Sequence, residues 1–211
     1  QPHILVGTAP EASFYLLQSE DTWQEYRGEE DNWCAALEYA DSLGVDIVTS
    51  SLGYTHFDRP AATLEYEWLD GHHELNSRSA SLAASRGILL LNSAGNSGDE
   101  SWKKIGFPAD AHDILAVGAV DEKGVNTAFS SSGFTADHRI TPDAMARGGA
   151  TALLATDGTV SQANGTSFAC PVLAGAVACL YQAFPLKQPK EIIEAIHQAG
   201  SCYSKPNEVY G

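Results

Sequence analysis

The stretch Asn164–Pro171, which reads NGTSFACP, decides most of what this sequence predicts. It leads from a polar, flexible pair into residues 166–184, which are apolar nearly all round and therefore predict a buried central helix. Ser167 falls in the first turn of that helix, where free backbone N–H groups and the helix dipole favour developing negative charge. A serine there is suited to act as a nucleophile, although capping the helix is the commoner role of serine or threonine at such a place.

Upstream of this stretch, two segments with helical periodicity each lead through a glycine into an apolar run, an alternation typical of an α/β protein. Residues 30–43 predict a helix and residues 45–50 a strand, and residues 73–86 and 88–92 repeat the pair. The apolar faces of these helices are predicted to comprise Trp33, Ala36, Leu37, Ala40 and Leu43 in the first, and Leu75, Leu82 and Ala83 in the second.

Shorter signals extend the pattern toward both ends of the chain. Residues 13–17 and 114–120 indicate further strands, and Pro189 opens a final amphipathic helix that Gly200 closes. Together, the four predicted strands and the helices between them favour a mostly parallel sheet. A length of 211 residues suits one domain, and we expect residues 1–211 to form a single one.

Composition limits the classes of partner and environment. The chain has 27 acidic against 12 basic side chains, a formal net charge of −15, which would repel a phosphate backbone, so we expect no nucleic acid partner. No apolar run approaches the roughly 20 residues that cross a bilayer, which predicts no membrane span, and the first residues resemble no export signal. The cysteines form no C-x-x-C pair and are interpreted as buried small apolar residues: Cys34, Cys170, Cys179 and Cys202.

Two other segments bear polar groups directly after predicted strands. Residues 93–98, which read SAGNSG, follow the strand 88–92 and predict a turn in which Gly95 and Asn96 supply positive-φ positions. The segment SLG, residues 51–53, follows the strand 45–50, and its glycine would let another chain approach closely. Each of these segments is weak evidence when taken alone.

In their order along the chain, these segments resemble the motifs of the subtilisin-like serine proteases, the subtilases of the S8 peptidase family. NGTSFACP is similar to the G-T-S-x-A-x-P segment around the family's nucleophile, SAGNSG to its A-G-N-x-G turn, and SLG to the strand that pairs with substrate. The resemblance covers nearly the whole chain, since GTAPEA at residues 7–12 and FPA at residues 107–109 also match. One departure is Arg147–Gly149, where many relatives have A-P-G.

The resemblance implies an α/β fold with three layers and a mostly parallel central sheet, and a hydrolase that cleaves polypeptides through an acyl-enzyme. Ser167 would be the nucleophile, and Asn96 would stabilise the oxyanion together with the backbone N–H of Ser167. The residues implied to bind the substrate are Ser51, Leu52, Gly53, Ser93, Ala94, Gly95 and Thr166.

The base and the orienting carboxylate that a serine nucleophile needs do not occur in this pattern. The family carries them upstream in H-G-T and D-[ST]-G segments, and neither segment is present. His3 lies too close to Gly7 to fill that place, and Asp21-Thr22 is followed by Trp23 where the motif needs glycine. The remaining histidines lie beyond the region where the base belongs: His56, His72, His73, His112, His138 and His197.

We therefore expect a partial peptidase domain, incomplete at its N-terminal side and inactive alone. Its expected partners are a polypeptide substrate and the missing N-terminal segment of the same protease. The main alternative is a non-catalytic protein that keeps the fold and binds peptides. A different α/β hydrolase is disfavoured, because no G-x-S-x-G motif surrounds Ser167.

No cofactor or metal ion is predicted from the residues. His72 and His73 lack the H-E-x-x-H spacing of a zinc site and are interpreted as exposed polar residues. The family resemblance makes structural calcium an expectation for which the sequence offers no site. It also implies a secreted or cell-envelope protein.

Overall fold

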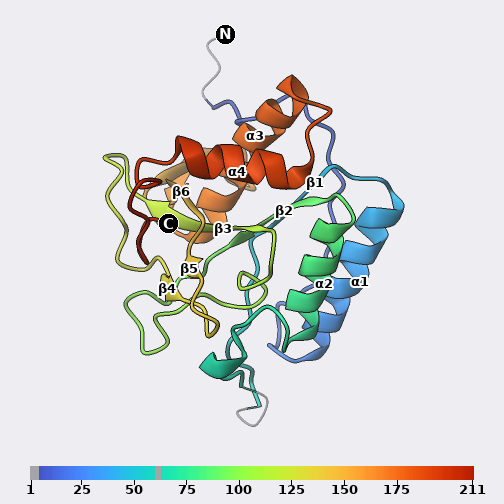
Figure 1. Ribbon diagram of the computed structural model, residues 1–211, viewed down its shortest axis with the longest axis vertical. Coiled ribbons are helices and arrows are strands. Elements are labelled where there is room, and N and C mark those ends of the chain that lie inside the picture. Colours follow the sequence, from blue (N-terminus) through green and yellow to red (C-terminus); the bar gives the residue numbers. More distant parts are fainter. Residues whose placement is uncertain (1–4, 60–62) are drawn as a thin grey trace.

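The centre of the computed structural model, which describes residues 5–59 and 63–211, is a four-stranded parallel sheet (Figure 1). Its strands are β1 (Ile47–Ser50), β2 (Leu89–Ser93), β3 (Leu115–Val120) and β6 (Ala144–Arg147), in the order β1-β2-β3-β6. Each pair is parallel, with Ile47 opposite Leu89, Leu91 opposite Leu115 and Val117 opposite Ala144. The expected α/β class with a mostly parallel sheet is confirmed.

Helices cover both faces of this sheet and make three layers. On one side lie α1 (Gly28–Ser42) and α2 (Leu75–Ser85), and on the other lie α3 (Thr166–Ala183) and α4 (Pro189–Ala199) (Figure 1). Successive residues of a strand point to opposite faces, so β2 serves both layers. Leu89 and Leu91 pack with α3 and α4, whereas Leu90 packs with α1 and α2.

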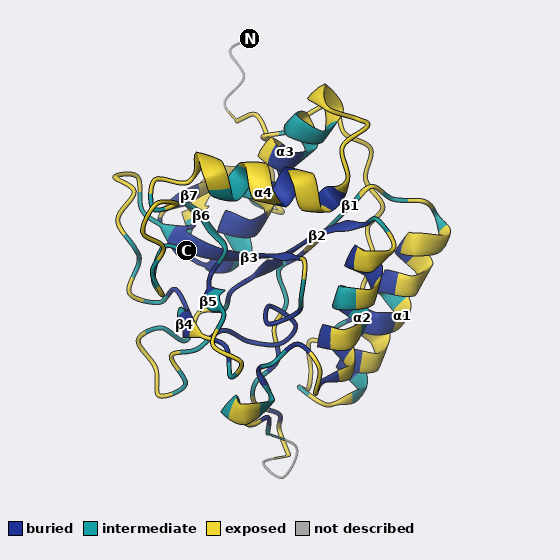
Figure 2. Ribbon diagram, viewed as in Figure 1, coloured by how far each residue is buried: buried dark blue, intermediate teal, exposed yellow. Residues whose placement is uncertain are grey.

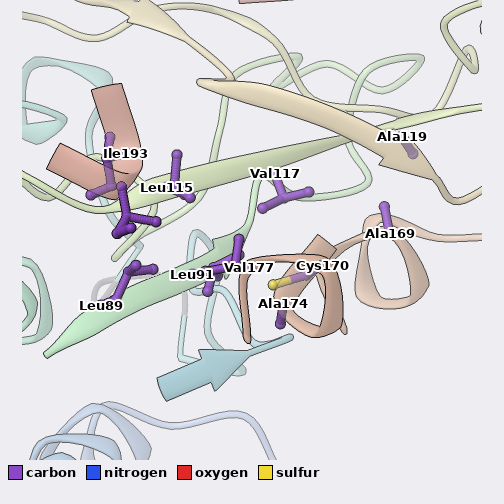
Figure 3. Close-up of a cluster of buried hydrophobic side chains, with 11 residues drawn as sticks. Leu89, Leu91, Leu115, Val117, Ala119, Ala169, Cys170, Ala174, Val177 and Ile193 are labelled. Atoms are coloured by element: carbon purple, nitrogen blue, oxygen red, sulfur yellow. The ribbon is translucent and has the colours of Figure 1, made fainter. Parts of the chain in front are cut away.

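The core between the sheet and α3 is apolar, and the dark strands and inner helix faces of Figure 2 show that it is buried. Figure 3 shows Leu91 of β2 beside Val177 of α3, and Leu115 of β3 beside Ile193 of α4. The residues of α3 in this cluster are Ala169, Cys170, Ala174 and Val177. Small side chains on α3 let it lie close to the strands and fix its height above the sheet.

Short elements complete the fold at the edges. A 3-10 helix, η2, spans Tyr66–Trp68. The strands β4 (Gly133–Phe134) and β5 (Ile140–Thr141) form one antiparallel pair, and β7 (Thr151–Leu154) and β8 (Val160–Ala163) form another. The second pair leads directly into the turn before α3.

The turn Arg147–Gly149, which departs from the family motif, holds the start of α3 against β3. The N–H of Gly148 donates to the carbonyl of Val120 at the end of β3, and the carbonyl of Gly148 accepts the N–H of Gly165 at 2.9 Å. A Cβ atom on Gly148 would lie only 2.6 Å from the carbonyl oxygen of Gly165. Glycine is needed here because the two backbones approach too closely for any side chain.

The predicted strand at residues 13–17 is wrong, and the fourth strand of the sheet is β6. Phe14, Tyr15 and Leu16 are 70%, 63% and 91% exposed, and no described strand pairs with their segment. A strand needs a neighbour to satisfy its backbone groups, and propensity alone does not supply one. The outer edge of β1 is likewise unpaired within the described part of the chain. His3 lies outside the described residues.

Two expectations about helix burial also need correction. The buried face of α2 does not include Leu75 or Leu82, which are exposed; it comprises Asn76, Ser77, Ala80, Ala83 and Ala84. Small residues face inward there because α1 and α2 pack closely together. The helix α3 is only partly buried, and Cys179 on it is exposed, contrary to the prediction that every cysteine is buried.

In the described ranges, α3 is also the one helix long and apolar enough to cross a bilayer. The core helix of a globular protein passes the same test of length and composition. Because α3 packs on the sheet through Ala169, Ala174 and Val177, part of its apolar surface has a partner within the protein. The absence of a membrane span stays a prediction.

Leu91→Ala tests the core beneath α3. Leu91 is fully buried in β2, so its truncation leaves a cavity and should lower the free energy of unfolding by about 2–5 kcal/mol. Leu186→Ala is the matched control, because Leu186 is 93% exposed and its truncation should change little. Urea denaturation of both variants measures the difference, and equal stability of the two would contradict this packing.

Candidate active site

Ser167 lies at the second position of α3, above the end of β1. Its Oγ donates to the carbonyl oxygen of Ser51 at 3.3 Å, and the Oγ of Ser51 donates back to the carbonyl oxygen of Ser167 at 2.9 Å. These two bonds join the residue after β1 to the first turn of α3. The N–H of Ser167 belongs to that first turn, whose N–H groups have no acceptor within the helix.

Asn96 lies in the turn after β2 and is oriented by Thr166. Its Oδ1 accepts the backbone N–H of Thr166 at 2.8 Å and the Oγ1 hydroxyl of Thr166 at 3.0 Å. The same hydroxyl accepts the N–H of Gly95 at 3.2 Å. Because two donors bind Oδ1, the orientation of the amide group is fixed, and Nδ2 remains available as a donor. Gly95 has the predicted positive φ, of +111°. The prediction of a positive φ for Asn96 is wrong.

A cavity of about 280 Å³ brings most of the predicted site together. Ser167 and Asn96, the predicted nucleophile and oxyanion donor, both line it. Of the residues predicted to bind substrate, those that also line it are Ser51, Leu52, Gly53, Ser93 and Gly95. Ala94 and Thr166 do not, because both are completely buried behind the lining. Thr166 acts from there on the orientation of Asn96.

Within the described ranges, no side chain that could act as a general base is hydrogen-bonded to Ser167. The lining of the cavity includes neither histidine nor aspartate, and the hydroxyl of Ser167 is directed to a backbone carbonyl. Cys170, one turn further along α3, offers no alternative nucleophile. Burial raises the pKa of its thiol to about 12, so it stays protonated and acts as a packing residue.

Two carboxylates in the lining, Glu20 and Glu25, are residues that sequence reasoning missed. They form a group with buried Glu29 in which the ligand oxygens all lie within 4.8 Å of one another. Tyr54 donates its hydroxyl to Oε1 of Glu20 at 2.6 Å. The run of acidic residues between 20 and 31 was the available signal, but it does not say which of them turn toward the cavity.

Burial is the main cause that raises the pKa of Glu25 from its ordinary 4.5 to about 7. Repulsion by the carboxylates of Glu29, Glu20 and Asp58 raises it further. Both causes disfavour the charged form. Glu25 therefore takes up a proton near neutral pH.

The acidic group does not fit the calcium ion that the family resemblance made an expectation. Calcium takes six to eight oxygen ligands. Here both oxygens of Glu29 already accept backbone N–H groups, from Asp21 at 2.7 Å and Tyr26 at 3.3 Å. Glu20 already accepts the hydroxyls of Tyr54 and Ser19.

Comparison with known proteins gives this site a context. The sequence profile of the subtilase family, Peptidase S8, matches residues 2–211. The chain is 28% identical to Subtilisin DY of Bacillus licheniformis over 189 residues, and 32% identical to Subtilisin BL of Lederbergia lenta over 181 residues. These matches cover 89% and 86% of this chain. They span 61% and 58% of the two relatives, so the chain corresponds to less than two thirds of either.

A solved structure supports the same relationship. The self-cleaved protease domain of PatA superimposes with a TM-score of 0.66 at 26% sequence identity. The superposition covers 85% of this chain and 63% of that domain.

Glu25→Gln tests the electrostatics of the cavity through the pH dependence of stability. The pKa of Glu25 is higher in the folded chain than its ordinary 4.5, so folding favours the protonated form. Its charged form therefore destabilises the fold increasingly as the pH rises from about 4.5 to about 7. The variant should have a higher Tm than the original chain at pH 8 and the same Tm at pH 4. Glu38→Gln, on the exposed side of α1, is the control, and an equal effect of Glu25→Gln at both pH values would refute the prediction.

Proposed function

This chain belongs to the subtilase family, and we propose that it is the serine-bearing part of an endopeptidase. It hydrolyses peptide bonds through an acyl-enzyme on Ser167 when the rest of the catalytic machinery is present. The observation that carries this proposal is the cavity shared by Ser167 and Asn96, with the amide of Asn96 oriented by two hydrogen bonds from Thr166.

The proposed reaction begins with attack of Ser167 Oγ on the carbonyl carbon of the substrate. The carbonyl oxygen becomes negative and is held by Nδ2 of Asn96 and the backbone N–H of Ser167. The proton of Oγ passes through the base to the substrate nitrogen, which leaves as an amine, and an ester remains on Ser167. Water then attacks the ester, releases the acid and returns a proton to Oγ. Because Oδ1 of Asn96 already accepts two bonds, its amide is preorganised and needs no reorientation during the reaction.

The proposed substrate path runs between two backbone segments. Gly53 follows β1 and Gly95 follows β2, so both lie at the carboxyl ends of neighbouring parallel strands and line the cavity. A glycine at each place lets an extended peptide approach and pair with the backbone. The substrate carbonyl would then reach Ser167 from this groove.

The proposed base and orienting carboxylate come from an upstream segment of the same protease. Two observations support this. The hydroxyl of Ser167 has a backbone carbonyl where a base should be. The apolar side chains of residues 14–16 are exposed, and the outer edge of β1 is open within the described ranges, which suits the addition of further chain. We also propose an extracellular or cell-envelope location, by family resemblance.

The second candidate is a peptide-binding protein without catalysis. It is favoured by the same missing base, since a groove with an inert serine would still bind peptides. It leaves the orientation of Asn96 without a role, because a binding groove needs no oxyanion donor. The endopeptidase is therefore the better-supported function.

Turnover of an unstructured protein substrate separates the two candidates. The protein expressed from its complete open reading frame should cleave the substrate, and its Ser167→Ala form should not. This chain alone should show only the residual rate, about 10³–10⁴ over water, that binding and oxyanion stabilisation leave in subtilisin when its triad is removed. A folded but inactive complete protein would favour the peptide-binding candidate. Robust Ser167-dependent cleavage by this chain alone would show that it contains its own base.

Asn96→Asp tests the proposed oxyanion donor in the complete protein. Aspartate keeps the acceptor for Thr166 but has no N–H, so kcat should fall by at least about 10²–10³, the loss that removal of one such donor causes in subtilisin. Thr166→Val should lower kcat with little change in KM, because it removes the hydroxyl, one of the two donors that orient the amide of Asn96, without entering the cavity, and Thr166→Ser should restore the rate. Unchanged kcat in Asn96→Asp would remove Asn96 from the proposed mechanism.

A further inference from the structure

We propose that the cavity beside Ser167 accepts a positively charged substrate side chain, held by the carboxylates of Glu20 and Glu25. This inference rests on the proposed function and names its substrate class: polypeptides with lysine or arginine near the cleaved bond. It is carried by a cavity that contains both the candidate nucleophile and two carboxylates.

The carboxylate of Glu25 lacks a partner within the described ranges. Its backbone N–H and carbonyl are paired with Asp58, but no hydrogen bond or ion pair reaches its side chain. It lies close to the carboxylates of Glu20 and Glu29. Carboxylates so close repel one another, and after burial this repulsion is the second cause of the raised pKa of Glu25. A cation between Glu20 and Glu25 would relieve this repulsion.

The chain's own cations do not fill that role. Lys104 lines the same cavity, but its Nζ lies over the ring of Tyr66, 5.5 Å from the centroid, and forms no described ion pair. Arg27 is engaged elsewhere, with Glu30 at 3.0 Å and Glu74 at 2.7 Å. No described lysine or arginine lies within 4.0 Å of the carboxylate of Glu20 or Glu25. A bound molecule could therefore supply the complementary charge.

A substrate side chain fits this place better than a metal ion. The oxygens of Glu29 already hold backbone N–H groups, which leaves two carboxylates against the six to eight oxygens that calcium takes. An arginine or lysine needs far fewer partners, and one guanidinium pairs well with carboxylate oxygens. The cavity also has room for a side chain, at about 280 Å³, and adjoins the glycines that line the proposed peptide path.

The two carboxylates differ in how firmly they are held. Glu20 is fixed by the hydroxyl of Tyr54, a residue that is 1% exposed. Glu25 has no such anchor and can adjust to the incoming group. Rigid and adaptable acceptors side by side would allow both a compact ammonium and a planar guanidinium to bind.

Peptide binding tests the proposal without requiring activity. The complete protein in its Ser167→Ala form is titrated with sets of fluorescent peptides. Within each set one position carries arginine, lysine, glutamine or methionine, and that position is moved along the peptide from set to set. At one position the arginine and lysine peptides should bind about 10-fold to 100-fold more tightly, the range for a hydrogen bond between charged groups. Glu25→Gln and Glu20→Gln should each remove most of this preference, measured as the ratio of affinities for the arginine and glutamine peptides. Glu38→Gln, an exposed glutamate on α1, should alter nothing.

The outcomes separate this inference from the proposed function. Equal binding of basic and neutral peptides, or a preference that survives in both glutamine variants, would overturn the inference even if the complete protein is an active endopeptidase. A preference that both variants abolish, in a complete protein that cleaves nothing, would uphold the inference and overturn the endopeptidase. Calcium chloride is titrated alone as well. Tight binding that both variants abolish, with no peptide preference, would assign the carboxylates to a metal ion instead.

Discussion

The site depends on how the first turn of α3 is held at the carboxyl ends of β1 and β2. The donors on Thr166 tie this turn to Asn96 after β2, and the reciprocal bonds of Ser51 and Ser167 tie it to β1. The close approach of Gly148 and Gly165 fixes the same turn against β3. Because parallel strands end at one edge of a sheet, three segments distant in sequence meet there. A shift of α3 along the sheet would separate Ser167 from Asn96, the proposed nucleophile and oxyanion donor.

Much of this arrangement can be predicted from sequence, because short motifs carry it. A buried run such as residues 88–92 indicates a parallel strand, and the turn SAGN and the helix start GTS each have a local physical reason. The sequence does not reveal which partners a segment meets. Residues 13–17 have strand composition but no described neighbour, and Leu75 and Leu82 repeat at helical spacing but lie on the exposed side of α2. Likewise, Glu20 and Glu25 are two acids among many until the fold turns them into the cavity.

Acidic side chains of this chain also gather at the cavity. Three carboxylates are kept close together although burial, and then their mutual repulsion, raise the pKa of Glu25 to about 7. Such an arrangement weakens the fold at the pH where Glu25 is charged, which is typical of groups retained for binding rather than for stability. It also gives the groove a charge that the glycines and hydroxyls of the lining do not provide. In the proposed function, the backbone segments would define where a peptide lies, and the carboxylates would influence which peptide binds.

Covalent labelling tests most directly whether Ser167 is a catalytic nucleophile supported by Asn96. The protein expressed from its complete open reading frame is treated with a fluorophosphonate, which phosphonylates activated serines, and the adduct is located by mass spectrometry of its peptides. We expect a single adduct on Ser167, formed much more slowly in Asn96→Asp and not at all after unfolding. A folded complete protein that remains unlabelled, or that is labelled on another residue while Ser167 stays free, would contradict this central claim.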